Sequence, residues 1–371
     1  MGPGALNQLA DEVTALKANK VLIVTDQGLI EAGLVKKAQN ILAKADIKHA
    51  VFGDVEADPR YEIVADCVEM IRRENADLLI GFGGGSPIDI AKISAVMAKN
   101  DGPLAEYFGL DLIPNPGLPT IIVPTTAGTA SEVTPIVILS DEEAKLKRGI
   151  VSAHLQPSVA LLDPELTIGL PPHITAATGM DALSHNLEAY LARGFHPLAD
   201  AIAIRGISLV ARFLPRAVSQ GADDLEARTA MMSASLMGAV AFQKGLGGIH
   251  SLAHALGSEC NLHHGLANAL VMPAMLRFNA EAVPGRMQDV ATALGASGAG
   301  YGADPGERAA QRVEELNREI GLPASLVETG VSADQKEAIV AAAHADACHQ
   351  SNPRPVTRSD FVRIIDSLFA T

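Results

Sequence analysis

Hydrophobic residues in the first 167 positions gather in short runs that alternate with longer amphipathic stretches. The runs are rich in β-branched residues and end at Asp, Gly or Pro, which is typical of buried parallel strands. They cover residues 20–25, 50–53, 77–82 and 118–123. Between them, residues 30–45 and 61–75 have helical periodicity. This alternation predicts a Rossmann-like α/β domain with a doubly wound parallel sheet, in which ligands bind at the carboxyl ends of the strands.

The pattern changes after Pro171 and Pro172. From there the chain is almost wholly helix-like. Long stretches with helical periodicity cover residues 196–218, 224–242, 264–281 and 307–320. We therefore expect an all-α C-terminal domain, with domains at residues 1–167 and 168–371. A chain of 371 residues is long enough for each domain to bury its own core.

A glycine-rich turn follows the predicted strand at residues 77–82. Gly83, Gly84 and Gly85 lack a Cβ that would obstruct a ligand, and Ser86 is placed to cap the helix that follows. Backbone N–H groups at the start of that helix, and the positive end of its dipole, favour a pyrophosphate. The turn differs from the G-x-G-x-x-G pattern, so its position between a strand and a helix is what indicates dinucleotide binding.

Polar side chains also follow two other predicted strands. A hydroxyl-rich loop with Thr125, Thr126 and Ser131 follows the last of them, and these small donors suit a phosphate or the nicotinamide carboxamide; an ordinary Ser/Thr turn is the alternative. Asp26 follows the first strand, where a carboxylate accepts hydrogen bonds from an adenosine ribose and repels a 2′-phosphate. A turn-forming Asp is the alternative at that position.

Histidines and an aspartate recur at helical spacing in the second half of the chain. His250 and His254 are four residues apart in an apolar stretch, and Asp181 and His185 repeat that spacing, so each pair shares one face of a helix. His264 follows His250 by fourteen residues. Burying these groups is costly unless they are paired, and a divalent cation pairs neutral imidazoles with an ionised carboxylate. The spacing favours a metal site over separately satisfied histidines, and it allows His254 as a ligand.

Three motifs in this order resemble the iron-containing (group III) alcohol dehydrogenase family, and they span nearly the whole chain. They are GGGSPIDIAK at residues 83–92, PTTAGTASEVT at residues 124–134, and the paired histidine stretches. The resemblance implies the fold of the dehydroquinate synthase-like superfamily, with an α/β and an all-α domain. It implies that the metal ligands are Asp181, His185, His250 and His264, and that His254 lies near the nicotinamide and passes a proton to solvent.

The resemblance also implies roles for residues of the N-terminal domain. Thr125, Thr126 and Ser131 belong to the family's cofactor cleft, and Asp26 resembles the residue that favours NAD over NADP. Lys147 is similar to a family lysine that reaches the cofactor, a solvated lysine being the alternative. Family members place a strand before an element like GPGAL, with which this chain begins. Either the start is late or this member lacks that strand.

The implied chemistry is hydride transfer between a small alcohol or aldehyde and NAD(H), with a metal that lowers the pKa of the alcohol oxygen. Fe(II) is the family's usual metal, and three imidazoles with a carboxylate also suit Zn(II), manganese or nickel. His263, beside His264, stays an alternative ligand. Lys244, shortly before His250, is interpreted as a group that recognises an anionic substrate tail; a surface lysine is the alternative.

Composition excludes several classes of partner. The net charge of −14 and the pI near 5.2 leave no basic surface for nucleic acid or anionic membrane. Three widely spaced cysteines, Cys67, Cys260 and Cys348, argue against a disulfide framework and for a reducing compartment. Cys260 lies between two proposed ligands and is interpreted as a buried small hydrophobe. No secretory signal or membrane span is evident, so we expect a cytoplasmic protein, and by resemblance a homodimer.

Other functions remain as alternatives. The superfamily includes dehydroquinate synthase-like lyases and glycerol-1-phosphate dehydrogenases, which need several basic residues around a phosphate or polyacid, and the proposed ligand segments are poor in Arg and Lys. A hydroxyacid-oxoacid transhydrogenase, which keeps NAD(H) bound while two substrates exchange hydride, is a closer relative. A non-catalytic binding protein would show the loss of a ligand or of the glycine turn, and neither is lost.

Overall fold

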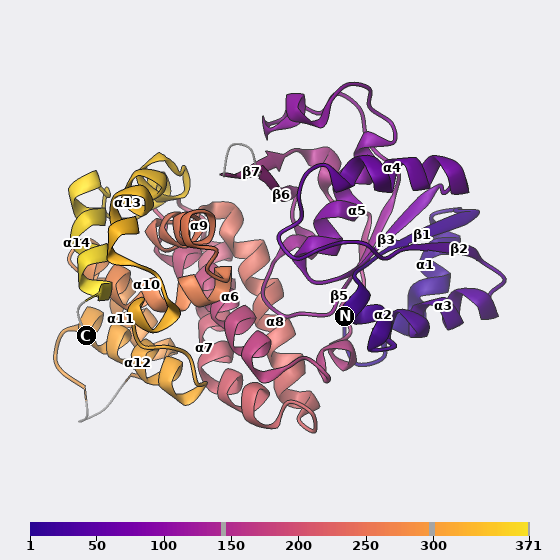
Figure 1. The fold of residues 1–371 in the computed structure, drawn as a ribbon. Helices are drawn as coiled ribbons and strands as arrows, with labels where there is room; N and C mark the ends of the chain where they lie inside the picture. Colours follow the sequence, from indigo (N-terminus) through magenta and orange to yellow (C-terminus); the bar gives the residue numbers. More distant parts are fainter. Residues whose placement is uncertain (142–145, 297–300, 370–371) are drawn as a thin grey trace. The chain divides into compact units, whose positions relative to one another are not determined.

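The computed structural model describes residues 1–141, 146–296 and 301–369. The chain divides into two compact units, Met1–Thr167 and Ile168–Thr371. The first contains a parallel sheet with helices, and the second is built from helices (Figure 1). This architecture confirms the predicted fold class.

The sheet of the first unit has five parallel strands in the order β2-β1-β3-β5-β8. Their bounds are β1 (Lys20–Val24), β2 (Lys48–Phe52), β3 (Leu78–Gly83), β5 (Thr120–Pro124) and β8 (Val159–Ala160). The helices are α1 (Leu9–Ala15), α2 (Gln27–Glu31), α3 (Leu34–Lys44), α4 (Ile63–Glu74) and α5 (Gly85–Met97). All six residues of β3 are buried, as expected for a strand covered on both faces.

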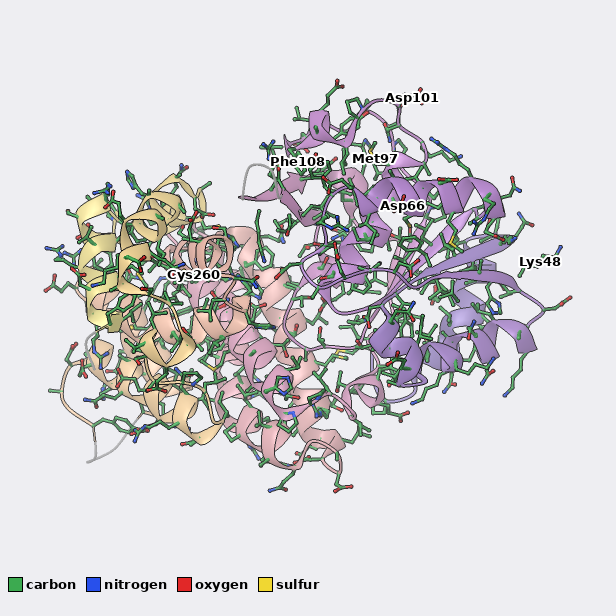
Figure 2. All side chains as sticks on the ribbon, viewed as in Figure 1. Lys48, Asp66, Met97, Asp101, Phe108 and Cys260 are labelled. Carbon is green, nitrogen blue, oxygen red and sulfur yellow. The ribbon has the colours of Figure 1, made fainter. Side chains whose placement is uncertain are left out.

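Alternate residues of the central strands belong to two separate cores. Val21 and Ile23 of β1 pack with α1 and α3, whereas Leu22 and Val24 pack with α4 and α5. Side chains alternate between the faces of a sheet, so α1 and α3 cover one face and α4 and α5 cover the other (Figure 1). The exposed Lys48 begins β2, at the edge of the sheet (Figure 2).

The order of the strands locates the ligand-binding edge of the sheet. Strand β1 pairs with β2 on one side and with β3 on the other. The winding therefore reverses between β1 and β3, and in such sheets ligands bind outside the carboxyl ends of the strands at the reversal. Asp26 follows β1 and the glycine turn follows β3, so both lie at this edge.

Apart from the short strand β8, which was not predicted, two features of the first unit differ from the prediction. The helix expected at residues 30–45 is two helices, α2 and α3, separated at Gly33, whose φ of +73° favours glycine. The second is a small sheet, with the order β4-β7-β6, that the periodicity did not reveal. Its strands are β4 (Gly109–Leu110), β6 (Ile136–Asp141) and β7 (Leu146–Val151).

The second unit consists mainly of long helices. They are α6 (Pro172–Leu191), α7 (Pro197–Gln220), α8 (Leu225–Ala241), α9 (Gly248–Cys260), α10 (His264–Ala280), α11 (Pro284–Ala293), α12 (Pro305–Glu319), α13 (Lys336–Ala345) and α14 (Arg358–Phe369). Helix α6 is buried at every position from Thr175 to Leu191 and packs against α7, α8 and α10. A helix buried all round forms the centre of its unit, so polar side chains on α6 are held in the interior. Among the described residues, no helix has the length and apolar character needed to cross a membrane.

Candidate active site

Two carboxylates and one imidazole lie along one face of α6. Asp181, His185 and Glu188 have the i, i+4, i+7 spacing that places side chains on one helix face. Each is no more than 5% exposed. A buried polar row on a central helix needs partners from neighbouring helices, and α9 and α10 supply them.

The Oδ1 atom of Asp181 is surrounded by three imidazoles. It lies 3.7 Å from Nε2 of His185, 3.8 Å from Nε2 of His250 and 3.4 Å from Nε2 of His264. Asp181, His250 and His264 each offer a ligand atom within 4.8 Å of the other two. His185 adjoins this set, since its ring stacks on that of His250 with centroids 4.8 Å apart. The structure therefore brings all four predicted ligands together.

Nε2 of His250 faces Asp181 and is buried without a hydrogen-bond partner. An unsatisfied buried polar atom is costly and calls for an explanation. A divalent cation with bonds of about 2.0–2.2 Å to four tetrahedral ligands places those ligand atoms roughly 3.4 Å apart. The separations around Asp181 are close to that value, so the residues fit a metal ion.

The protonation states suit a cation as well. Burial lowers the pKa of His185 to about 4 and lowers that of His250 well below its ordinary value. Burial alone would raise the pKa of Asp181, but the adjacent imidazoles, first His185 and then His264, outweigh it and hold the pKa below its usual range. Neutral imidazoles and an ionised carboxylate are the forms that bind a metal.

Glu188 is a functional candidate that the sequence analysis missed. Its Oε2 accepts a hydrogen bond of 2.6 Å from Nδ1 of His250, which directs Nε2 of that ring toward Asp181. Its carboxylate also accepts from the backbone N–H groups of Ile249 and His250, in the first turn of α9, where the helix dipole favours a negative charge. Burial raises the pKa of Glu188 to about 7. The i, i+7 spacing from Asp181 was the signal that could have revealed it.

Asn268, one turn after His264 on α10, joins two of the proposed ligands. Its Nδ2 group donates to Oδ1 of Asp181 at 2.8 Å and lies 3.2 Å from Nε2 of His264. The side chain is fully buried. It holds the carboxylate of α6 against α10, and its i, i+4 spacing from His264 was available in the sequence.

His254 lies beside the cluster and has a carboxylate partner of its own. Its ring stacks on that of His264 with centroids 5.3 Å apart, and its Nδ1 lies 2.9 Å from Oδ2 of Asp346. The other oxygen of Asp346 accepts from the Ser251 hydroxyl at 2.8 Å. Sequence reasoning had no means to find Asp346, because it is 92 residues from His254. His254 is absent from the group of ligand atoms around Asp181.

Neither His263, the alternative ligand, nor Cys260 is part of the group around Asp181. His263 is exposed at the start of α10. Cys260 lies in the last turn of α9 and is only partly buried (Figure 2). Burial raises the pKa of its thiol to about 11.

In the first unit, the glycine turn opens α5 as predicted. A Cβ on Gly83 would lie 2.8 Å from Cγ of Pro87, and the φ of Gly83 is +154°, so a side chain does not fit there. Gly84, Gly85 and Ser86 are partly exposed. The expected cap by Ser86 is wrong: Gly84 is the N-cap, α5 begins at Gly85, and no side chain caps the helix. The first N–H groups of α5 are therefore left for a ligand.

The hydroxyl-rich loop packs against this turn. Cβ atoms added to Gly84 and Gly85 would lie 3.6 Å from Cγ2 of Thr126 and 3.3 Å from Cβ of Thr129. Both threonines have a buried Oγ1 atom without a hydrogen-bond partner. The buried Thr125 donates its N–H to the carbonyl of Gly83 at 2.9 Å. Unpartnered hydroxyls beside an uncapped helix fit the phosphates of a dinucleotide.

Ser131 is engaged within the protein. Its hydroxyl donates to Asp89 and accepts from Nζ of Lys92 at 3.2 Å. Lys92, which is 1% exposed, also donates to the carbonyls of Ser131, Thr134 and Ile136 at 3.0, 2.8 and 2.6 Å. Burial lowers the pKa of Lys92 to about 8. Asp89 and Lys92 thus fix the shape of the loop that carries the threonines.

The remaining predicted residues form internal contacts. Asp26 caps α2 by accepting from the Leu29 N–H at 2.9 Å, and it stays partly exposed at the edge of the sheet. Lys147 lies on strand β7, and its ammonium pairs with Asp58 at 2.5 Å. Its side chain is 19% exposed, so this ion pair competes with any contact to a cofactor.

The interpretation of Lys244 as an anion receptor is wrong. Its side chain is 1% exposed, and its ammonium donates to Asp200 at 2.6 Å and to the carbonyl of Tyr190 at 3.1 Å. Arg286 binds the other oxygen of Asp200 at 2.8 Å. A buried and paired ammonium cannot reach a substrate, so Lys244 holds α7 to the end of α6.

Comparisons with known proteins agree with both units. The Fe-containing alcohol dehydrogenase C-terminal model matches residues 175–369, and the iron-containing alcohol dehydrogenase model matches residues 1–164. The NAD-dependent methanol dehydrogenase of Bacillus methanolicus is 38% identical, over 98% of this chain and 96% of its own length. The 4-hydroxybutyrate dehydrogenase of Cupriavidus necator is 41% identical, also over 98% of this chain and 96% of its own length. A solved 1,3-propanediol oxidoreductase has a TM-score of 0.95 and 39% identity, over 99% of this chain and 97% of that one.

The chain belongs to the iron-containing alcohol dehydrogenase family. It is accordingly an oxidoreductase that acts on CH–OH groups, as the family and its curated relatives are.

Proposed function

We propose that the protein is a metal-dependent, NAD-linked dehydrogenase that interconverts a small primary alcohol and its aldehyde. The observation that carries the proposal is the arrangement of three imidazole Nε2 atoms within 3.8 Å of one Asp181 oxygen, where the buried Nε2 of His250 lacks a hydrogen-bond partner. Asp181, His185, His250 and His264 are proposed to hold the cation, which in this family is Fe(II), while Zn(II) suits the same donors. When bound, the cation lowers the pKa of the alcohol and NAD accepts the hydride.

Within this site, Glu188 keeps the ring of His250 in one orientation and one tautomer. Because Nδ1 of His250 carries the proton that Glu188 accepts at 2.6 Å, Nε2 presents a lone pair toward Asp181. Carboxylates that fix a ligand histidine in this way raise its basicity as well. Glu188 thus prepares the ligand before any substrate arrives.

His254 and Asp346 are proposed to move the proton of the alcohol. His254 shares the proton on Nδ1 with Asp346, so its Nε2 is free to accept a proton from the substrate. Burial opposes ionisation of Asp346, but the hydrogen bonds that its carboxylate accepts, first that from His254, outweigh it and keep the pKa of Asp346 below its usual range. The ionised Asp346 then stabilises the imidazolium that forms on His254.

The first unit is proposed to bind NAD at the edge of its sheet. The N-terminus of α5, with Gly83, Gly84 and Gly85, would hold the pyrophosphate, and Thr126 and Thr129 would offer it hydroxyls. Asp26, at the neighbouring strand end, favours the ribose of NAD over the 2′-phosphate of NADP. The relative named an NAD-dependent methanol dehydrogenase supports this choice of cofactor.

The substrate is proposed to be a short primary alcohol or diol, because the similar proteins include a methanol dehydrogenase and a 1,3-propanediol oxidoreductase. Protein stripped of metal and reloaded with Fe(II) or Zn(II) tests the proposal in an assay of NADH production from alcohols, diols and hydroxy acids. We expect activity only with metal and its loss in His264→Ala. The matched control is His263→Ala, which alters the exposed neighbour and should stay active. Turnover without metal, or an active His264→Ala variant, would contradict the mechanism.

A further inference from the structure

A second group of metal-binding side chains lies beside the first. Among the described residues, His254, Asp346 and Cys348 also have ligand atoms within 4.8 Å of one another. His254 comes from α9, Asp346 is the C-cap of α13, and Cys348 begins the short helix that follows. All three are partly exposed. Burial raises the pKa of the Cys348 thiol well above its ordinary value, so this thiol loses its proton only when a cation replaces it. The group thus combines an imidazole, a carboxylate and a thiol at a position that solvent reaches.

Hydrogen bonds hold two of these donors in place before any cation binds. Oδ1 of Asp346 accepts from the Ser251 hydroxyl at 2.8 Å and from the backbone N–H of Cys348 at 2.7 Å. The Ser251 oxygen in turn accepts from the N–H of His349 at 2.9 Å. Oδ2 of Asp346 faces Nδ1 of His254 at 2.9 Å. A cation would therefore meet a largely prearranged set of ligands, which lowers the cost of ordering them.

The donor set favours borderline and soft cations. Thiolate and imidazole bind Zn(II) well, whereas Mn(II) prefers oxygen ligands, and the affinity order for divalent metals places Zn(II) above Fe(II) and Mn(II). The group around Asp181 has no sulfur donor. The two groups thus differ in the metals that they select.

We propose that His254, Asp346 and Cys348 form a second, inhibitory site for a thiophilic divalent cation such as Zn(II). The cation forms bonds to Nδ1 of His254, to Oδ2 of Asp346 and to Sγ of Cys348. The S–H bond of Cys348 breaks and its proton goes to solvent, so one proton is released for each cation bound. The hydrogen bond between His254 and Asp346 is lost, and the imidazole proton moves through solvent from Nδ1 to Nε2. No group is oxidised or reduced.

Inhibition follows from the change of tautomer. With its proton on Nε2, His254 cannot accept a proton from the substrate alcohol, and Asp346 is no longer available to stabilise an imidazolium. This consequence rests on the proposed function, in which Nε2 of His254 is the proton acceptor. Binding of the cation itself does not rest on it, so the two claims are tested by different measurements.

Titration of the purified protein with Co(II) tests the binding claim. Cobalt is a spectroscopic stand-in for zinc, and a cobalt–thiolate bond gives an intense near-ultraviolet band. We expect this band, with release of about one proton per added ion, only after a first equivalent has been bound. Cys348→Ser should lose the band and bind one ion fewer. Cys260→Ser, which changes the thiol at the end of α9, is the matched control and should keep both.

Activity measurements on the metal-loaded enzyme test the inhibitory role. Excess Zn(II) should abolish turnover of the wild type and of Cys260→Ser. Excess Mn(II) should not, and Cys348→Ser should keep its activity in excess Zn(II). Cys348→Ala is a second variant without the thiol and should behave as Cys348→Ser does. A thermal melt of each variant excludes misfolding as the cause of any change in activity.

Each outcome decides one claim. A cobalt–thiolate band that persists in Cys348→Ser would overturn the site, as would the absence of any band in the wild type. Equal inhibition of wild type and Cys348→Ser by Zn(II) would overturn the inhibitory role. If the loaded enzyme shows no turnover under any condition while the band appears as expected, the proposed function fails and the second site stands.

Discussion

Glu188 on α6 and His250 on α9 form a buried pair in which Oε2 of the glutamate lies 2.6 Å from Nδ1 of the imidazole. The same carboxylate accepts the N–H of Ile249 at the start of α9. One side chain therefore sets both the position of the helix and the orientation of a proposed ligand that the helix carries. Metal affinity should depend on Glu188 although it is absent from the group of ligand atoms around Asp181.

Replacement of Glu188 tests that dependence. Glu188→Gln keeps the size of the side chain and removes its charge, so we expect metal affinity to fall by about 10- to 100-fold, the range typical of lost outer partners of ligand histidines. Competition with a chelator measures the affinity. Glu226→Gln, at a side chain that is 68% exposed, is the control. Unchanged affinity in Glu188→Gln would show that the pair only anchors α9.

Replacement of Asp346 separates proton transfer from metal binding. In Asp346→Asn the amide can donate to Nδ1 of His254, which moves the imidazole proton to Nε2 and blocks its role as acceptor. We expect kcat to fall about 10²- to 10⁴-fold, the usual contribution of a positioned base, with metal content unchanged. Steady-state kinetics at saturating NAD, together with metal analysis, measure both. A variant with normal kcat would remove His254 from the proton path.

The glycine turn predicts a steric effect on cofactor binding. Gly83→Ala would place a Cβ 2.8 Å from Pro87 and 3.0 Å from Leu29, in a backbone conformation that side chains rarely adopt. We expect a loss of about 1–3 kcal/mol in unfolding free energy and a higher KM for NAD. Denaturant unfolding and kinetics measure these. Gly285→Ala, where an added Cβ meets nothing within 4 Å, should have neither effect.

The buried Lys92 predicts a pH dependence of stability. Burial lowers its pKa from 10.5 to about 8 in the folded protein, so the unfolded chain holds more protons than the folded one between these values. The free energy of unfolding should therefore rise with pH across this window, by at most about 1.4 kcal/mol per pH unit from this group. Lys92→Met lacks the titrating ammonium and so lacks this pH dependence. The wild type should therefore gain stability over the variant as the pH rises from 8 to 10.5. A constant difference in urea unfolding across the window would contradict the assignment.

The sequence predicted the fold class because strands buried on both faces and helices buried on one produce different hydrophobic periods. It missed β6 and β7, since the hairpin is half buried and carries the charged Lys147 and Arg148. It also extended one helix through Gly33, where a positive φ separates two. The hydrophobic pattern predicted the elements correctly where burial is regular. It failed where a turn determines where one element ends and the next begins.

For the candidate site, helical spacing and family resemblance identified the side chains that meet around Asp181. The same spacing could have revealed Glu188 and Asn268. Asp346 was not predictable, because its contact with His254 depends on how α13 packs against α9. Lys244 was misassigned because its nearness to His250 in the sequence does not determine which way its side chain points. In the structure its ammonium pairs with Asp200.

The most direct test of the account is an anomalous-difference map from crystals of the protein loaded with Fe(II) or Co(II). We expect a peak bonded to Asp181, His185, His250 and His264, with Glu188 still in contact with Nδ1 of His250. A metal-loaded, active protein whose first-occupied peak lies away from Asp181 would contradict it.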